Sequence, residues 1–274
     1  MLLLIGIVIG LLLGLTGAGG SVFAVPLLIL LGDVSIHQAV SLSLAAVATI
    51  TFYGSVRNLG NQTILWKPAA LLAGSGMLGA PLGQIFASIL SEVLLVAGFS
   101  LLAVIIAVRM WLMATTMPEA SKVVRSSHLS LDNAKGVLCK FSPDGKFQLR
   151  PRCMGGLLLG GFLVGILSGL FGVGGGFLII PLLLLLSQVS MVQAVSTSLV
   201  VITLISSIGF ISHLTFGEIN YLPFKSLAWL IAGGLTGMYA GQLISHRIAN
   251  AHLQKIFSIG LLLVAVTLFY VQTT

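Results

Sequence analysis

Two long apolar segments of this 274-residue chain are interrupted by nearly the same cluster of glycines. The first is GLTGAGGSVFAVP at residues 14–26, and the second is GLFGVGGGFLIIP at residues 169–181. They align without gaps at an offset of 155 residues, with six of 13 positions identical. The stretches VSIHQAVSLSL (34–44) and VSMVQAVSTSL (189–199) keep that offset, with eight of 11 positions identical. The chain is therefore predicted to be a duplication of one unit.

The composition places this duplication in a lipid bilayer. Hydrophobic residues make up 57% of the chain and charged residues only 7%, whereas soluble domains carry about 25% charged residues. Each half contains four apolar segments near the length of roughly 20 residues that crosses a hydrocarbon core. We therefore expect an all-α polytopic membrane protein. The expected segments are 1–31 and 154–186, 35–57 and 190–213, 67–90 and 223–246, and 92–115 and 252–271.

A polar linker separates the two halves. It divides the chain into a first membrane repeat (1–116), the linker itself (117–152) and a second membrane repeat (153–274). The linker holds seven of the 13 Lys and Arg residues. Such clusters are typical of cytoplasmic loops, so we expect this loop in the cytoplasm and no nucleic-acid partner. Pro-Asp-Gly at 143–145 favours a hairpin turn, and a small hairpin and a disordered loop both stay open.

The two cysteines of the chain, Cys139 and Cys153, lie at this linker. In the cytoplasm we expect them to be unrelated reduced thiols, with a regulatory disulfide as the alternative. Together with His128 they would supply at most three metal ligands, at a spacing unlike that of zinc sites. The sequence contains no P-loop, and we expect neither a metal nor another cofactor.

The glycine-broken segments allow two topologies. If each segment crosses the membrane once, each half has four spans and the halves are parallel. If each segment folds back as a re-entrant hairpin, each half has three full crossings and the second half is inverted. The inverted arrangement keeps Arg247 and Lys255 on the same side as the basic linker. The positive-inside rule therefore favours inverted repeats.

The glycine clusters predict a binding site for a small anion. Glycine adopts backbone conformations that other residues avoid, so each cluster ends one half-helix and starts another. Unwound backbone at membrane depth must be buried in protein or line a cavity, and the N–H groups at a helix N-terminus attract anions. Matched polar residues on the next helices would complete one central site. The predicted substrate-binding residues are Gly17, Gly19, Gly20, Ser21, Gln38, Ser41, Ser43, Gly172, Gly174, Gly175, Gly176, Gln193, Ser196, Thr197 and Ser198.

Close packing is the alternative role of small residues in membrane helices, and hydroxyls can also bond to their own helix. Two further side chains, Arg57 and His213, are candidates for gating or coupling, although both are also typical of residues at a membrane interface. No Asp or Glu lies deep in an expected span, so no buried carboxylate relay is expected. The glycines for which we expect packing alone are Gly74, Gly79, Gly83, Gly233, Gly237 and Gly241.

With two copies of the glycine motif, each followed by QAVSLSL or QAVSTSL, the chain resembles the TauE/SafE family of sulfite and organosulfonate exporters and permeases. The resemblance covers both membrane halves and leaves out the linker. It implies a multi-pass protein of the cell (inner or plasma) membrane that transports sulfite, thiosulfate or an organosulfonate. The family's His-x-x-x-Gly pattern matches His213 and Gly217, whereas the first half has Asn58 and Gln62 at those positions.

A secondary transporter or permease is therefore the expected function, with alternating access around a central site. The alternative is a membrane-embedded enzyme or sensor that binds a small anion. A dinucleotide-binding fingerprint would need glycine where Val22 and Phe177 stand, so the residues disfavour a nucleotide-binding enzyme. The expected partners are a small anionic substrate and the lipid bilayer, and a homo-oligomer stays open.

Overall fold

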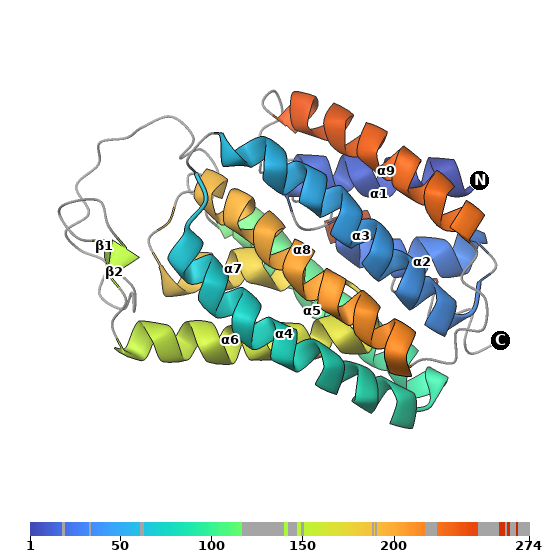
Figure 1. Cartoon of the computed structure of the whole chain (residues 1–274), viewed down its shortest axis with the longest axis horizontal. Helices are drawn as coiled ribbons and strands as arrows, with labels where there is room; N and C mark the ends of the chain where they lie inside the picture. Colours follow the sequence, from blue (N-terminus) through green and yellow to red (C-terminus); the bar gives the residue numbers. More distant parts are fainter. Residues whose placement is uncertain are drawn as a thin grey trace.

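The long elements of the chain are helices that lie side by side in one bundle (Figure 1). The computed structural model describes residues 1–17, 20–32, 34–60, 63–116, 140–141, 147–148, 151–187, 189, 191–216, 224–245, 258–260, 262–263 and 267. The elements are α1 (Leu2–Thr16), α2 (Ser21–Gly32), α3 (Ile36–Leu59), α4 (Trp66–Ile89), α5 (Glu92–Thr116), β1 (Lys140–Phe141), β2 (Phe147–Gln148), α6 (Pro151–Phe171), α7 (Gly176–Leu186), α8 (Met191–Phe216) and α9 (Phe224–Ser245).

Five of these helices are long and apolar enough to cross a membrane, among the residues that the structure describes. They are α3, α4, α6, α8 and α9, while α1, α2 and residues Val93–Val108 of α5 form shorter apolar helices. The prediction of an all-α polytopic membrane protein is therefore confirmed. Of the last expected helix, 252–271, the described residues 258–260, 262–263 and 267 are helical.

Each glycine-broken segment folds back on itself as a helical hairpin. Gly32, at the end of α2, lies beside Leu2, at the start of α1. In the second half, Gly160 of α6 lies beside Leu182 of α7, and Gly156 lies beside the last residue of α7. At about 1.5 Å per residue, the 15 residues of α1 and the 12 of α2 are each shorter than a full crossing. Both segments therefore fold back as helical hairpins, although α6, with 21 residues, is by itself long enough to cross a membrane.

Two helix pairs join the two halves, and in each pair the hairpin helix of one half packs against a helix of the other half. The hairpin helix α1 packs along α9, and its counterpart α6 packs along α4 (Figure 1). Gly10 lies against the backbone of Gly234, and Gly14, one turn on, lies against Met238. Both residue numbers rise together, so α1 and α9 run in the same direction. The equivalent contacts between α6 and α4 show the same parallel direction.

Glycine lets these paired helices approach until their backbones touch. A Cβ atom on Gly79 or Gly83 would overlap the carbonyl oxygens of Phe162 or Ile166 in α6. Packing is confirmed in the same way for Gly233, Gly237 and Gly241, which lie against the backbone of α1. The expectation was wrong for Gly74: nothing described lies within 4 Å of a Cβ at that position, because this residue is on the exposed face of α4.

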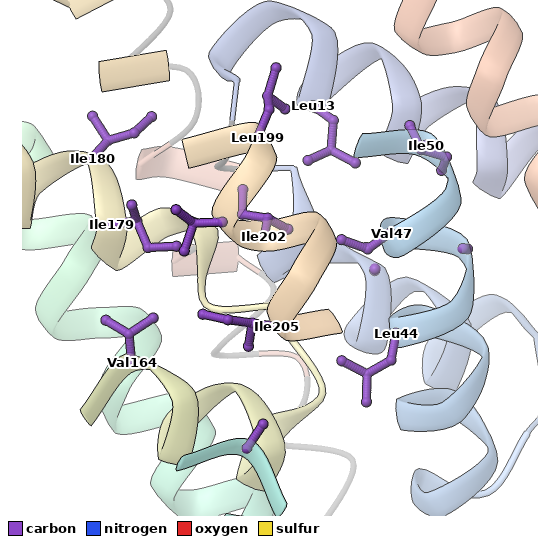
Figure 2. Close-up of a cluster of buried hydrophobic side chains, with 14 of the residues drawn as sticks. Leu13, Leu44, Val47, Ile50, Val164, Ile179, Ile180, Leu199, Ile202 and Ile205 are labelled. Atoms are coloured by element: carbon purple, nitrogen blue, oxygen red, sulfur yellow. The ribbon is translucent and has the colours of Figure 1, made fainter. Parts of the chain in front are cut away.

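The second helices of the two halves, α3 and α8, form the centre of the bundle. These two helices run antiparallel. Ser55 lies by Thr203, whereas Thr63, which follows α3, bonds to Ser196, which is nearer the start of α8. Figure 2 shows Ile202 of α8 between Val47 of α3 and the residues of α6 and α7. The hydrophobic effect of this shared core therefore holds both hairpins against the central pair.

The linker contains the expected hairpin. Strands β1 and β2 pair antiparallel, with Lys140 opposite Gln148 and Phe141 opposite Phe147. The residues expected to form the turn, 143–145, lie outside the described residues.

The cysteine expectation was wrong. Cys153, in the first turn of α6, is fully buried and disulfide-bonded, and Cys139 is the only other cysteine of the sequence. The physical reason lies in the hairpin. Strand β1 begins one residue after Cys139, and the antiparallel pairing reverses the chain before α6 begins.

Candidate functional site

Left-handed glycines make both breaks. Gly17 has φ 76° and ends α1, with its N–H donating to Leu13 O at 2.7 Å. Gly172 has φ 68° and ends α6 in the same way, with its N–H donating to Ser168 O at 2.8 Å. A glycine with positive φ is a common helix stop, because other residues pay a steric penalty there. The matched glycines of the duplication therefore stop matched helices.

Each break contacts the second helix of the opposite half. Gly17 lies against Val195 of α8, and Gly172 lies against Val40 of α3. Val40 and Val195 are themselves related by the 155-residue offset. In addition, the Ser43 hydroxyl donates a buried hydrogen bond of 2.9 Å to the carbonyl oxygen of Gly172. The structure therefore brings the glycine motif of one half together with the Gln-Ala-Val-Ser motif of the other.

The second break reaches the middle of the central helix pair. Gly174, with φ 70°, lies beside Ser206 of α8 and Val47 of α3. A Cβ on Gly174 would be 2.6 Å from the Ser206 Oγ and 3.2 Å from the Val47 Cγ1. Gly175, with φ 67°, lies beside Ser168 at the end of α6. Helices α6, α7 and α8 of the second half and α3 of the first half thus meet at this break.

The N-terminus of α7 points its free N–H groups into that junction. Residues Gly174 to Phe177 are all buried. Among the described residues, none of their N–H groups donates a backbone hydrogen bond outside α7. The first N–H groups of a helix also have no partner within it. Together with the helix dipole, these donors make the junction suitable for a small anion.

The predicted hydroxyls of the second helices are buried, but they have different partners. Ser196 accepts a hydrogen bond from the Thr63 hydroxyl at 2.8 Å, and Thr197 accepts one from Leu65 N–H at 3.0 Å. Ser198 donates to its own helix at Val195 O. These three hydroxyls therefore hold the segment before α4 and their own helix, whereas Ser43 reaches a break directly.

The remaining predicted site residues lie in several environments. Gly20 and Ser21 are buried at the start of α2, Gly176 is buried at the start of α7, and Ser41 is buried in α3. Gln38 is exposed and Gln193 is half-buried. Gly19 lies outside the described residues. The structure thus brings most of the predicted set to the two breaks but leaves Gln38 at the surface.

Arg57 and His213 do not lie at the breaks. Arg57 is exposed near the end of α3, and its guanidinium carbon lies 4.8 Å from the centroid of the Tyr239 ring. This cation–π contact with α9 agrees with an anchoring role. His213 is only 6% exposed in the last turn of α8, two helical turns beyond Ser206.

Sequence reasoning missed several buried polar groups near the second break. Ser168 and Ser206 have hydroxyl oxygens without a hydrogen-bond partner among the described residues. The same holds for Gln84 Oε1, and the Gln84 backbone lies beside Gly169. Buried polar atoms normally have a partner, so these groups mark a place where a ligand or water belongs. No group of three or more His, Cys, Asp or Glu in the described part could hold a metal.

A half-open cavity of about 250 Å³ lies between α3, α8 and α9. Ser207 contributes to its lining, and the adjacent Ser206 lies at the second break. The cavity and the break therefore lie on different sides of the α3–α8 pair. Its lining residues are Ala45, Ala48, Thr49, Ser207, Phe210, Ile211, Leu227 and Ile231.

Comparison with known proteins decides the family. A family model described as sulfite exporter TauE/SafE matches residues 2–268. The chain belongs to the TauE/SafE family. Its relatives include a "Probable membrane transporter protein" of Xylella fastidiosa (strain Temecula1), 27% identical over 97% of this chain and 92% of the relative. "Probable membrane transporter protein YunE" of Bacillus subtilis is 28% identical over 98% of this chain and 97% of its own length.

A third relative is similar to most of the chain. "Probable membrane transporter protein MJ0441" of Methanocaldococcus jannaschii is 26% identical over 94% of this chain and 90% of its own length. No solved structure matches the chain. The family and the apolar helices together identify a multi-pass protein of a membrane transporter family.

Proposed function

We propose that the chain is a secondary transporter or permease for a small sulfur-containing anion, such as sulfite, thiosulfate or an organosulfonate. The substrate passes through a central site between the two broken helices. One observation carries this proposal: each glycine break lies against the second helix of the opposite half, at Val195 and at Val40. Broken helices at matched positions of two repeats are typical of substrate sites in secondary transporters.

The proposal includes inverted repeats, 1–116 and 153–274. A hairpin returns the chain to the side on which it began, so α3, α4 and α5 then make three crossings. The second hairpin therefore starts from the opposite side. The antiparallel α3–α8 pair and the parallel α1–α9 pair agree with this arrangement. The seven basic residues of the linker, 117–152, favour a cytoplasmic location under the positive-inside rule.

The chemistry of the breaks supports an anion as the substrate. The buried polar side chains of the described residues are Ser, Thr, Gln and His, and no Lys, Arg, Asp or Glu is among them. Backbone N–H groups and hydroxyls would therefore bind the anion without a fixed counter-charge. Such binding is moderate, which suits a site that must also release its substrate.

The central helix pair provides the moving part. Val47 of α3 and Ile202 of α8 close over Gly174 in this conformation, while the 250 Å³ cavity opens on the other side of the pair. A small rotation of one half against the other would separate Val47 from Ile202 and connect the break to the cavity. This is alternating access by rocking of the two repeats.

Flux into proteoliposomes tests the proposed function. Radiolabelled sulfite should enter vesicles containing the protein faster than protein-free vesicles, and an imposed proton gradient shows whether transport is coupled to protons. Gly174→Leu should abolish flux, because leucine would meet Ser206, Val47 and Ile202 in a left-handed conformation. Gly74→Leu is the matched control, since this glycine faces open space. Absence of flux for sulfite, thiosulfate and methanesulfonate alike would refute transport of this substrate class.

A further inference from the structure

Two buried serines at the second break have hydroxyls without a hydrogen-bond partner among the described residues, a property that they share with Ser100 and Ser212 elsewhere in the bundle. Thr51, Ser55 and Ser207 each donate to a carbonyl four residues earlier in the same helix. Ser168 and Ser206 make no hydrogen bond to any described residue, although they are 1% and 0% exposed. A buried hydroxyl without a partner costs about 1–3 kcal/mol. These two hydroxyls are therefore available to a ligand.

The Ser206 hydroxyl and the Ser168 side chain both lie beside the glycines of the break. The Ser206 Oγ is 2.6 Å from the position of a Cβ on Gly174, and the Ser168 Cβ is 3.4 Å from that on Gly175. Gly175 is the N-cap of α7, an 11-residue helix. Side chains of α6 and α8 and the first backbone groups of α7 therefore meet at Gly174 and Gly175. Several donors around a point match the three oxygens of a sulfonate-type group.

The donors are neutral, and this selects the charge of the ligand. The cost of removing an ion from water grows with the square of its charge, so a dianion costs about four times as much as a monoanion of similar size. Neutral donors gain only in proportion to the charge. We propose that Ser168, Ser206 and the N–H groups of Gly174–Phe177 form the substrate subsite, and that it takes monoanionic –SO₃ groups, namely hydrogen sulfite and alkylsulfonates. This inference rests on the proposed function for its substrate class.

The subsite belongs to the second half alone. At the 155-residue offset, the positions of Ser168 and Ser206 are occupied by Leu13 and Thr51. Leu13 is a fully buried apolar side chain, and the Thr51 hydroxyl donates to Val47 O at 2.7 Å. The first break therefore lacks both free hydroxyls, and one ligand per chain is expected.

The titratable groups around the subsite limit how pH can act. His213 on α8 is the buried one among the described residues, and Cys153 on α6 is disulfide-bonded. Tyr53 and Arg57 on α3 and Lys67 on α4 are exposed. Protonation of His213 would strengthen the binding of every anion at low pH. Protonation of sulfite to hydrogen sulfite would strengthen only the binding of sulfite.

Equilibrium binding to the purified full-length protein in detergent, read by ligand-induced thermal stabilisation and by radioligand competition, separates these cases. The probes are methanesulfonate, sulfite and thiosulfate at pH 6 and pH 8. Methanesulfonate should bind equally at both pH values, sulfite should bind more tightly at pH 6, and the dianion thiosulfate should bind weakly at both. Ser168→Ala and Ser206→Ala should each weaken methanesulfonate binding about tenfold. Ser88→Ala is the matched control, because this serine is exposed and donates to its own helix at Ile85 O, and it should leave the binding unchanged.

Each outcome has a defined meaning. Thiosulfate binding as tight as methanesulfonate binding would overturn the charge selection, and so would methanesulfonate binding that rises at pH 6. Unchanged affinity in both serine variants would overturn the subsite, even if the wild type transports sulfite. Binding that depends on the serines, in a protein that shows no flux in vesicles, would support the subsite and refute the transport function.

Discussion

The two glycine breaks share a motif and a left-handed first glycine, Gly17 or Gly172, but differ in side chains at matched positions. Leu13, one turn before the first break, is a fully buried apolar side chain, whereas the second break has Ser168 in the matched position and the free Ser206 hydroxyl nearby. Duplication gave both breaks the same left-handed glycine that ends a helix. Divergence then left Leu13 and Thr51 in one half and Ser168 and Ser206 at the matched positions of the other. A symmetric fold can therefore hold an asymmetric site.

The largest expected effect is a loss of stability at the first break, in contrast to a loss of ligand binding at the second. Leu13→Ala should lower the free energy of unfolding by about 2–5 kcal/mol, because it opens a cavity in a fully buried region. Its affinity for methanesulfonate should stay that of the wild type. Ser168→Ala should do the reverse, since it removes a hydroxyl without a protein partner. Denaturant unfolding in detergent and ligand binding measure the two quantities, and loss of both properties in both variants would erase the distinction.

An intermediate effect should be equal at the two breaks. Gly17→Ala and Gly172→Ala each place a side chain in a left-handed conformation, at a cost of about 1–2 kcal/mol, and each meets a valine of the opposite half. Both variants should therefore lose similar stability in the same unfolding measurement. Gly74→Ala is the control and should be neutral or gain up to about 1 kcal/mol. A large difference between the first two variants would mean that the breaks are not equivalent in backbone structure.

The smallest expected effect distinguishes two serines at matched positions of the duplication. Ser43→Ala removes the buried hydrogen bond to the Gly172 carbonyl and should cost about 1 kcal/mol or more. Ser198→Ala removes only a bond to its own helix and should cost less than about 0.5 kcal/mol. Thermal unfolding of the two variants, measured side by side, provides the comparison. Equal melting temperatures would show that the contact between the halves at Ser43 adds nothing to stability.

The helices and their breaks were predictable, because each depends on a local pattern. Apolar length identifies the spans, and the glycine cluster at Gly172 leaves a helix no favourable way to continue. The pairing of α1 with α9 was not predictable. Four helices carry similar stripes of small residues, and the sequence does not say which stripe faces which.

The candidate site was predictable only where it depends on the backbone. Sequence reasoning placed an anion at the glycine breaks but missed Ser168 and Ser206, which look like ordinary serines of membrane helices. What distinguishes them is that they lie at the glycine break without a partner among the described residues, and that is a property of the folded structure. The available signal was the loss of symmetry, since Leu13 and Thr51 stand at the matched positions. Ser196 and Thr197 were assigned to the site by their motif, yet they hold the segment before α4.

The exchange of partners between the halves sets a time order for biosynthesis. The hairpin helix α1 leaves the ribosome well before its packing partner α9, which ends only at Ser245. Until then the backbone-deep grooves at Gly6, Gly10 and Gly14 have no helix to fill them. The first hairpin must therefore wait, near the membrane or within the insertion machinery, while more than 200 further residues are made. A polypeptide that stops after the first half would lack the packing partners of its hairpin helix α1 and of α4. Quality-control proteases would meet it in that state.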